Sequence, residues 1–379
     1  MAMHNLSYWE HQAFLQGADV VIIGGGLVGL TAAIYTRQLR PTARVLVLER
    51  DVLPNGASTK NAGFACFGSI SELLEQEARG GTEALLAVVR ARWDGLRRLR
   101  ELLDDEPIRY QPEGGFELFR PEEKDIAAAC QKRVAYYNEL LAPLIGHANI
   151  FRDASPRIAS LGLAGTAVML ENTAEGSLDT GQMMQELLRK AWAAGVTVLH
   201  GCPVLGVETS HGSVRVQLEG LELQAGQVLV ATNAFSRELL PGLDVIPGRG
   251  QVLVTEPIPG LQLPGTFHYD KGYYYFRQVG ERVLLGGGRN LDFQAEETTE
   301  SGITPLVQQR LEQLLHEVIL PGRRPRIDYR WSGVMGFGRE LEPIIREVEP
   351  ALFVAVRCNG MGVAMGAGSG WQAAKLMSK

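Results

Sequence analysis

A glycine-rich turn between an apolar run and an amphipathic run constrains this chain more than any other feature. Residues 19–23 are mostly β-branched, and residues 27–39 carry leucine and isoleucine at helical spacing, which predicts a strand followed by a helix. Gly24, Gly26 and Gly29 lie in this turn, where glycines permit a tight turn, close approach of a diphosphate and close helix packing. The pattern therefore predicts a dinucleotide-binding βαβ unit.

An acidic residue stands where such a unit binds a ribose. The next apolar run, residues 45–48, ends on Glu49, twenty positions after the last glycine of the turn. A carboxylate there can accept hydrogen bonds from both ribose hydroxyls and disfavours a 2′-phosphate, although the adjacent Arg50 leaves that point open. Leu27 and Val28, which begin the helix, are included among the nucleotide-binding residues. The motif alone does not distinguish NAD from FAD.

Length, composition and charge favour a globular chain with a small-molecule partner. The chain has 379 residues, of which 45% are hydrophobic, so two packed domains are expected. Its formal charge of −6 comes without a long run of Lys or Arg, which argues against nucleic acid or an anionic membrane as the main partner.

Cysteine and histidine usage argues against other kinds of site. The seven histidines include no pair at metal-ligand spacing, so no metal is predicted. The apolar stretch at residues 18–35 is interrupted by glycines, which argues against a signal peptide or an integral membrane segment. Four widely separated cysteines indicate neither a zinc site nor a disulfide framework and fit a reducing, cytoplasmic location. They are Cys66, Cys130, Cys202 and Cys358.

The remaining pattern predicts an α/β fold in which a Rossmann-type domain is interleaved with a second, antiparallel-sheet domain. Helices are predicted at residues 72–78, 83–103, 122–144 and 180–194, and aromatic or β-branched strands lie between residues 250 and 288. The nucleotide-binding domain is assigned to residues 1–80, 150–240 and 325–379. The substrate domain is assigned to residues 81–149 and 241–324.

Several further segments resemble the D-amino-acid oxidase/glycine oxidase family of flavoenzymes. Residues 56–63 (GASTKNAG) follow the second strand as the G-A-S-x-x-N-A/G-G segment of that family does. Four later blocks look like blocks of the same family and occur in the same order. The nearest branch is the γ-glutamylputrescine oxidoreductase-like group, which shares the Ser-Tyr-Trp of residues 7–9 and an arginine-free W-x-G block. These later blocks are residues 231–234 (ATNA), 249–251 (RGQ), 331–333 (WSG) and 360–363 (GMGV).

The resemblance implies a glutathione reductase-like FAD-binding fold that holds FAD noncovalently. Polar side chains after the second strand and backbone N–H groups near the C-terminus would then lie beside the diphosphate and the isoalloxazine, and a strand at Val204 would touch the adenine. The implied flavin-binding residues are Ser58, Thr59, Lys60, Asn61, Ala62, Gly63, Val204, Ala231, Thr232, Asn233, Gly333, Gly360, Met361, Gly362 and Val363.

The resemblance also implies a reaction. Enzymes of this family pass a hydride from the carbon bearing the amine to flavin N5, and the resulting imine is hydrolysed by water. The implied partners are an amine or amino-acid substrate and oxygen or another electron acceptor. Because the cofactor carries the chemistry, the protein has mainly to desolvate and orient the substrate, and no catalytic triad is expected.

Substrate-site candidates come from the aromatic strand. Tyr273 and Tyr275 fall on one face of a predicted strand, and Tyr274 and Phe276 fall on the other, so one pair can line a pocket. A packed sheet face explains the same pattern equally well. Arg277 and Arg289 are candidates for a bidentate clamp on a carboxylate, with a surface salt bridge as the alternative for each.

Three positions depart from the family pattern. Met335 stands where glycine oxidase-like members carry a substrate-clamping arginine, which argues against a simple D-amino acid or glycine as substrate. Leu284 stands where sarcosine oxidase-like members carry an oxygen-activating lysine. Residues 333–337 contain no cysteine for covalent flavin attachment, and Cys358 is expected to be a buried structural thiol.

Two rival functions remain open from the sequence. The same βαβ unit would serve an NAD-dependent dehydrogenase, and a chain that retains its nucleotide without turnover would be a redox sensor. Substrate identity, chirality and electron acceptor are not determined by the sequence.

Overall fold

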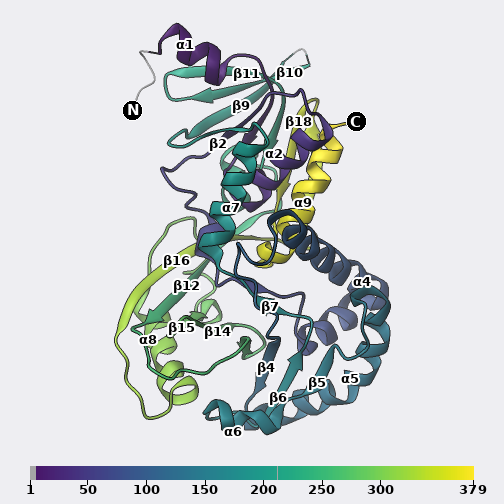
Figure 1. Ribbon diagram of the computed structural model, residues 1–379, viewed down its shortest axis with the longest axis vertical. Helices are drawn as coiled ribbons and strands as arrows, with labels where there is room; N and C mark the ends of the chain where they lie inside the picture. Colours follow the sequence, from purple (N-terminus) through teal and green to yellow (C-terminus); the bar gives the residue numbers. More distant parts are fainter. Residues whose placement is uncertain (1–5, 211) are drawn as a thin grey trace.

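The computed structural model describes residues 6–210 and 212–379 and has a sheet at each end of an elongated molecule (Figure 1). The chain passes between the two ends several times. Residues 1–5 and residue 211, which fall in the predicted nucleotide-binding segments, lie outside the described residues.

The first sheet has a parallel core in the order β18-β11-β1-β2-β8, and β17 pairs antiparallel with β18 at one edge. The first half of β11 leaves this core to pair with β10, which pairs with β9. The strands are β1 (Ala18–Ile23), β2 (Val45–Leu48), β8 (Thr197–Leu199), β9 (Val204–Ser210), β10 (Ser213–Leu218), β11 (Leu221–Val230), β17 (Ile344–Glu349) and β18 (Leu352–Val356).

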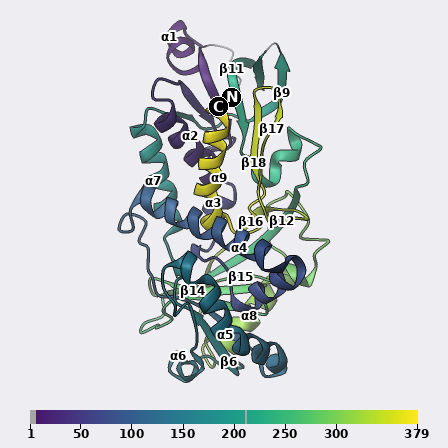
Figure 2. The same ribbon diagram turned by 90° about the vertical axis from the view of Figure 1, so that its right-hand side faces the viewer.

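Both faces of the parallel core are buried, which explains why β1 is an almost continuous apolar run. Val20 and Ile22 pack against helices on one face, whereas Val21 and Ile23 pack against the β9–β10 hairpin on the other. Figure 2 shows the helices on one side of this sheet and β9 on the other. The helices are α2 (Leu27–Leu39), α7 (Thr180–Ala193) and α9 (Gly362–Met377).

The second sheet has the order β16-β12-β15-β14-β13-β4-β6-β5. Its neighbours are antiparallel except for the parallel pair β4–β13. Its strands are β4 (Gly115–Phe119), β5 (Phe151–Asp153), β6 (Val168–Asn172), β12 (Ile246–Thr255), β13 (Thr266–Tyr269), β14 (Tyr274–Val279), β15 (Arg282–Gly287) and β16 (Ile327–Phe337).

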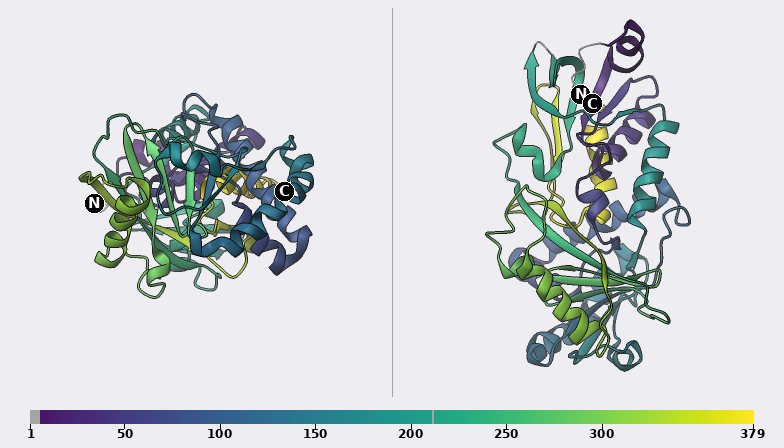
Figure 3. Two further views of the ribbon diagram at one scale, coloured as in Figure 1. Left: turned by 90° about the horizontal axis from the view of Figure 1, so that it is seen from below. Right: turned by 90° about the vertical axis from the view of Figure 1, so that its left-hand side faces the viewer.

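Helices cover the second sheet from two directions. Helix α8 (Pro305–Leu314) lies against the outer face, where Val307 and Leu311 pack with Tyr274 and Phe276 (Figure 3). Helix α4 (Ile70–Leu103) and helix α5 (Lys124–Ile145) enclose a separate apolar cluster beside β5 and β6. Shorter elements are α1 (Tyr8–Glu10), α3 (Ala57–Lys60), α6 (Ile158–Leu161) and the paired strands β3 (Phe64–Ala65) and β7 (Gly176–Ser177).

The predicted domain boundaries are wrong in two places. Strands β5 and β6 lie in the second sheet although residues 150–240 were assigned to the nucleotide-binding domain, and β16 lies there although residues 325–379 were so assigned. The reason is that β6 and β16 pair with β4 and β12, which are distant in sequence. The two helices predicted at residues 72–78 and 83–103 are the two segments of α4, which meet at a kink where Gly81 has a non-helical φ of 78°.

Candidate functional site

A cavity of about 570 Å³ runs between the two sheets and receives residues from both. One part is lined by the glycine turn after β1, the end of β2 and the start of β9. The other part is lined by the inner faces of β12 to β16 and by the start of α9. The cavity therefore lies where the sequence predicts a nucleotide next to a substrate domain.

The glycine turn brings backbone without side chains to the cavity just before α2 begins. Gly24 has a φ of 110°, and a Cβ atom there would lie 2.8 Å from the carbonyl oxygen of Ala231. A Cβ atom on Gly29 would overlap the carbonyl oxygen of Gly24. The start of α2 presents its N–H groups and the positive end of its dipole to the cavity, and Leu27 N donates to Ser58 Oγ at 2.9 Å. This arrangement suits a diphosphate.

Glu49 lines the same part of the cavity at the end of β2. Its Oε2 accepts a hydrogen bond from Gly25 N at 2.8 Å, and its Oε1 accepts one from Asp51 N at 3.2 Å. The two bonds fix the carboxylate and leave acceptor capacity on both oxygens for ribose hydroxyls. Arg50 lies across the Phe235 ring, 4.2 Å from the ring centroid, which places a cation and an aromatic ring at the rim.

Segment 56–63 is ordered largely by its own polar side chains. Thr59 Oγ1 donates to Pro54 O, while Asn61 Nδ2 donates to Ser58 O at 2.8 Å and Asn61 Oδ1 accepts from Gly63 N at 2.8 Å. Asn61 therefore shapes the loop rather than presenting a free amide. Ser58, Lys60, Asn61 and Ala62 line the cavity, whereas Thr59 and Gly63 do not.

Arg277 lies outside the cavity, so the clamp predicted for it is wrong. Its side chain is buried behind segment 56–63, where Nε donates to Ala62 O and Nη2 donates to Leu178 O. Burial lowers the pKa of Arg277 to about 10. The residue is better described as a brace between β14 and the loop that faces the cavity.

The second part of the cavity is mostly aromatic and apolar. Tyr273 and Tyr275 line it, whereas Tyr274 and Phe276 pack in the core behind the sheet. Tyr273 precedes β14 instead of lying within the predicted strand. Met335 also lines the cavity, next to Gly250 and Gly360. Tyr273, Tyr275 and Met335 form an aromatic and apolar wall of what we call the chamber, the second part of the cavity.

Arg289 is the arginine that faces this chamber. It lies 4.2 Å from the centroid of the Phe337 ring and 5.0 Å from that of the Phe293 ring, so the guanidinium is held by aromatic faces. Its Nε is buried without a hydrogen-bond partner, and no acid within the described residues forms an ion pair with it. Burial lowers the pKa of Arg289 from its usual value.

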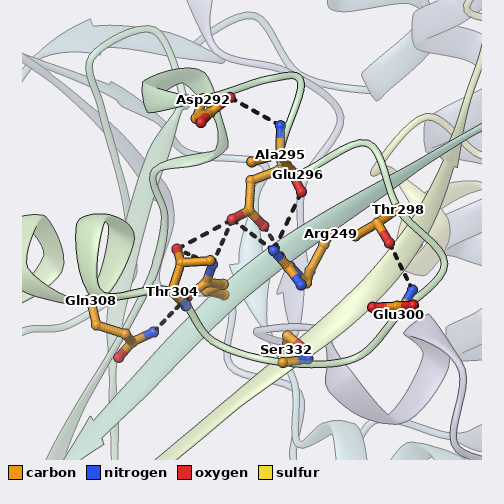
Figure 4. Close-up of polar contacts among 11 residues, drawn as sticks. Arg249, Asp292, Ala295, Glu296, Thr298, Glu300, Thr304, Gln308 and Ser332 are labelled. Atoms are coloured by element: carbon orange, nitrogen blue, oxygen red, sulfur yellow. Dashed lines mark hydrogen bonds and ion pairs between the residues drawn. The ribbon is translucent and has the colours of Figure 1, made fainter.

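A polar network fixes the loop that carries Arg289. Glu296 accepts from Arg249 Nε at 2.7 Å and from Gln251 Nε2 at 2.8 Å, and Gln251 Nε2 also approaches Thr304 Oγ1 at 2.9 Å. Figure 4 shows Glu296 between Arg249 and Thr304. The Arg-Gly-Gln segment at residues 249–251, which resembles a family block, thus ties β12 to Glu296 and Thr304.

Polar residues that the sequence did not single out also line the chamber. His268 and Glu72 both line the cavity, although the sequence indicates for Glu72 only a place in a predicted helix. In the sheet, His268 of β13 is paired with Tyr275 of β14 and with Glu117 of β4. Their place in the chamber could have been predicted only from the register of the paired strands, because the residues that meet there are far apart in the chain.

Two fully buried carboxyl groups lie behind His268 and Glu72. Burial raises the pKa of Glu117 to about 7 and that of Glu175 to about 8. Glu175 Oε1 accepts from the N–H groups of Phe67 and Gly68, at 2.8 and 2.9 Å. Both groups therefore hold protons more strongly in the folded chain than in the unfolded one.

We expect Glu175→Gln to stabilise the folded protein at alkaline pH. The pKa of the Glu175 carboxyl rises from 4.5 to about 8 on folding, so between these two pH values the folded protein holds a proton that the unfolded chain has lost. The free energy of unfolding therefore falls as the pH rises from 4.5 to about 8. Glutamine mimics the protonated acid and should raise the free energy of unfolding at pH 8.5 by on the order of 3 kcal/mol, with little change at pH 5. Urea unfolding at both pH values measures this, and a variant with an unchanged pH slope would contradict it.

The residues fit FAD by their chemistry. The glycine turn, the start of α2 and Glu49 suit a diphosphate and a ribose. Thr232 and Arg289 also line the cavity, and the buried atoms Thr232 Oγ1 and Arg289 Nε have no hydrogen-bond partner among the described residues, so a bound ligand could supply one. Of the predicted flavin-binding residues, all but Gly29, Thr59 and Gly63 line the cavity. Those that do so include Val28, Val204, Ala231, Asn233, Gly333, Met361, Gly362 and Val363.

Other kinds of site find no support in the described part of the chain. No group of three or more His, Cys, Asp or Glu residues there is placed to hold a metal ion. Among residues 6–210 and 212–379, no helix is long and apolar enough to cross a membrane.

Known proteins similar to this chain are flavoenzymes and oxidoreductases. A model of the family described as FAD dependent oxidoreductase matches residues 19–376. The chain is 24% identical over 360 residues to the "Probable oxidoreductase OrdL" of Rhizobium meliloti, covering 91% of this chain and 79% of that protein. It is 24% identical over 324 residues to the glycine oxidase of Bacillus licheniformis, covering 83% and 80% respectively.

Solved structures show the same fold. The L-proline dehydrogenase from P. horikoshii superposes with a TM-score of 0.74 at 18% identity, over 96% of this chain and 94% of that one. The glycine oxidase from Geobacillus kaustophilus superposes with a TM-score of 0.73 at 20% identity, over 95% and 94%.

Proposed function

This chain belongs to the family of FAD-dependent oxidoreductases, and from that premise we propose that it oxidises the C–N bond of an amine or amino acid. The predicted family and fold class are confirmed, and an NAD-dependent dehydrogenase is no longer favoured. Relatives named for amino-acid or amine oxidation, such as the glycine oxidase, support the reaction class.

One observation carries the proposal: a single cavity joins nucleotide-binding features to the chamber on the second sheet. Gly24 and Glu49 lie in the first part, and Tyr275, Met335 and Arg289 lie in the second. A substrate in the chamber would therefore lie next to a cofactor bound in the nucleotide part of the cavity. Such proximity is what a hydride-transfer reaction needs.

Bound FAD would accept the hydride from the substrate carbon and pass the electrons to oxygen or another acceptor. The chain's own residues bind and orient the substrate. The Tyr275 ring and the Met335 side chain exclude water from the reacting carbon, and Arg289 binds a substrate carboxylate where one is present. The oxidised product is an imine, which water hydrolyses after release.

We propose that FAD is held noncovalently. Cys66, Cys202 and Cys358 line the cavity, but burial raises the pKa of the Cys358 thiol to about 11 and that of Cys66 well above its usual value. Protonated thiols are poor nucleophiles, so attachment to the flavin is disfavoured. The four buried cysteines are free, which supports our placing the enzyme in the cytoplasm.

Anaerobic flavin reduction tests the function. The purified protein should be yellow, release its flavin on acid precipitation, and lose its flavin absorbance when mixed with a suitable amine or a D- or L-amino acid. Repetition in air with peroxide detection separates an oxidase from a dehydrogenase. Reduction by small alcohols alone would refute C–N oxidation, and a flavin that none of these compounds bleaches would indicate a redox sensor.

We expect Arg289→Met to weaken the binding of carboxylate-bearing substrates by about 10-fold to 100-fold, because a charge-assisted hydrogen bond contributes roughly 1.5–3 kcal/mol. Amines that lack a carboxylate should be affected little. The measurement is the substrate concentration that half-saturates anaerobic flavin reduction. An equal loss for a carboxylate-bearing and a carboxylate-free amine would show that Arg289 is not a clamp.

A further inference from the structure

Beyond Arg289, the chamber has an acidic side formed by Glu72, His268 and Phe64, all of which line the cavity. The rings of Phe64 and His268 meet edge to face with centroids 5.2 Å apart, and Phe64 also meets Tyr275 at 5.7 Å. This acidic side therefore combines a carboxylate, an imidazole and two aromatic rings.

Glu72 has one oxygen committed and one available. Its Oε1 accepts from Arg92 Nη1 at 2.8 Å and from Gln76 Nε2 at 2.7 Å. Within the described residues, no hydrogen bond to Oε2 is formed, and the side chain is 35% exposed. The carboxylate is therefore held in place while one oxygen remains able to accept.

Arg92 is the cation that pairs with Glu72 among the described residues, at 2.8 Å. Arg92 is buried beside it and also donates to Phe67 O at 2.8 Å, whereas Glu175 and Glu117 are both buried nearby. The negative charge of Glu72 contributes to the raised pKa of each of these two carboxyl groups, after the larger effect of burial. Because their pKa values are raised to about 8 and about 7, these two groups hold protons at or near neutral pH, and Glu72 is the acid of the three that offers a charged oxygen to the cavity.

His268 supplies an independent indication of a ligand. Its Nε2 is buried and has no hydrogen-bond partner among the described residues. Burial lowers the pKa of His268 to about 4, so the ring is neutral at pH 7 and one of its nitrogens is an acceptor. A buried polar atom without a partner is costly, and in the tautomer that carries its proton on Nδ1 the Nε2 atom would be satisfied by an N–H donor from a ligand.

We propose that Glu72 and His268, walled by Phe64 and Tyr275, bind a protonated nitrogen of the substrate other than the nitrogen whose C–N bond is oxidised. This inference rests on the proposed function. Its reason is chemical: an amine must lose its proton before its carbon gives up a hydride, and a neighbouring carboxylate would oppose that loss. The substrates assigned to the site are thus diamines and amino acids with a basic side chain.

The test compares ligands that differ by one ammonium group: lysine against norleucine, and 1,4-diaminobutane against n-butylamine. The holoenzyme is titrated anaerobically, and the half-saturating concentration is read from the change in flavin absorbance, whether or not the flavin is reduced. In the unmodified protein the second ammonium should tighten binding by about 10-fold or more. In Glu72→Gln this advantage should fall to about 2-fold or less, while norleucine and n-butylamine bind as before.

Two further variants complete the test. Glu75→Gln, on an exposed residue of the same helix paired with Arg79, should keep the full ammonium advantage. His268→Phe, which keeps a ring but removes the acceptor, should reduce the advantage severalfold even if Glu72→Gln folds poorly. An unmodified protein that binds both members of each pair equally overturns this inference but leaves C–N oxidation standing if n-butylamine or norleucine reduces the flavin. A flavin that responds to none of the four ligands overturns this inference, and C–N oxidation falls with it only if the wider panel of amines and amino acids also leaves the flavin unbleached.

Discussion

Replacing Gly29 with alanine is expected to yield a protein that retains little or no FAD and is less stable by about 3 kcal/mol. The Cβ atom would overlap the carbonyl oxygen of Gly24 and press on the Ile22 side chain. Neither backbone nor buried strand can move away cheaply, so α2 must shift from β1. That shift would displace the N–H groups at the start of α2 from the diphosphate position.

The matched control is Gly56→Ala in the same cavity. No atom lies within 4 Å of the Cβ position at Gly56, and its φ of −81° suits any residue. The ratio of flavin to protein absorbance after purification, together with urea unfolding, measures both effects. A Gly29→Ala protein with full flavin content would show that the turn is not the diphosphate site, whereas equal losses in both variants would show that any added methyl group is harmful.

The nucleotide half of the site was predictable because its residues are close in sequence or fixed by strand order. Gly24 and Gly26 lie in one turn, and Glu49 follows at the end of the next strand, so their proximity follows from the βαβ connection alone. The remaining flavin-binding residues came from the family resemblance. Their roles as FAD ligands stay proposals, although most of them line the cavity.

The chamber half was not predictable in the same way, because it depends on pairing between distant strands. His268 faces the chamber because β13 lies between β14 and the much earlier β4, a parallel pairing that local patterns do not indicate. Glu72 reaches the chamber from the first turn of α4, which sequence reasoning treated only as a helix. The same distant pairing placed β5, β6 and β16 in the second sheet.

Arg277 and Arg289 show what sequence leaves undecided for residues of one type. Both follow aromatic or glycine-rich strand segments, and both were equal candidates for a carboxylate clamp. The structure separates them by their surroundings: Arg277 donates to two backbone carbonyls behind the cavity, and Arg289 lies between aromatic rings in the chamber. The two positions predict opposite consequences of the same substitution.

Arg277→Met is expected to destabilise the protein by about 3 kcal/mol and to weaken FAD retention, because it leaves the buried carbonyl oxygens of Ala62 and Leu178 without their donor. Methionine fills much of the volume, so the loss reports the hydrogen bonds rather than a large cavity. Segment 56–63 would then lose its attachment to β14. Urea unfolding of the holoprotein and titration of the apoprotein with FAD measure the two effects.

Arg289→Met is the matched control, since Arg289 forms no ion pair within the described residues and braces no loop. It should lower the free energy of unfolding by no more than about 1 kcal/mol, from the lost contacts with the Phe337 and Phe293 rings, and should mainly alter substrate binding. A stable Arg277→Met protein with unchanged FAD affinity but weakened carboxylate binding would reverse our assignment of the two arginines. We expect the opposite pattern: Arg277→Met loses stability and Arg289→Met loses substrate affinity. The reason is that the Arg277 guanidinium donates to backbone carbonyls and so supports the fold, whereas the Arg289 guanidinium has no acidic partner among the described residues and is available to a ligand.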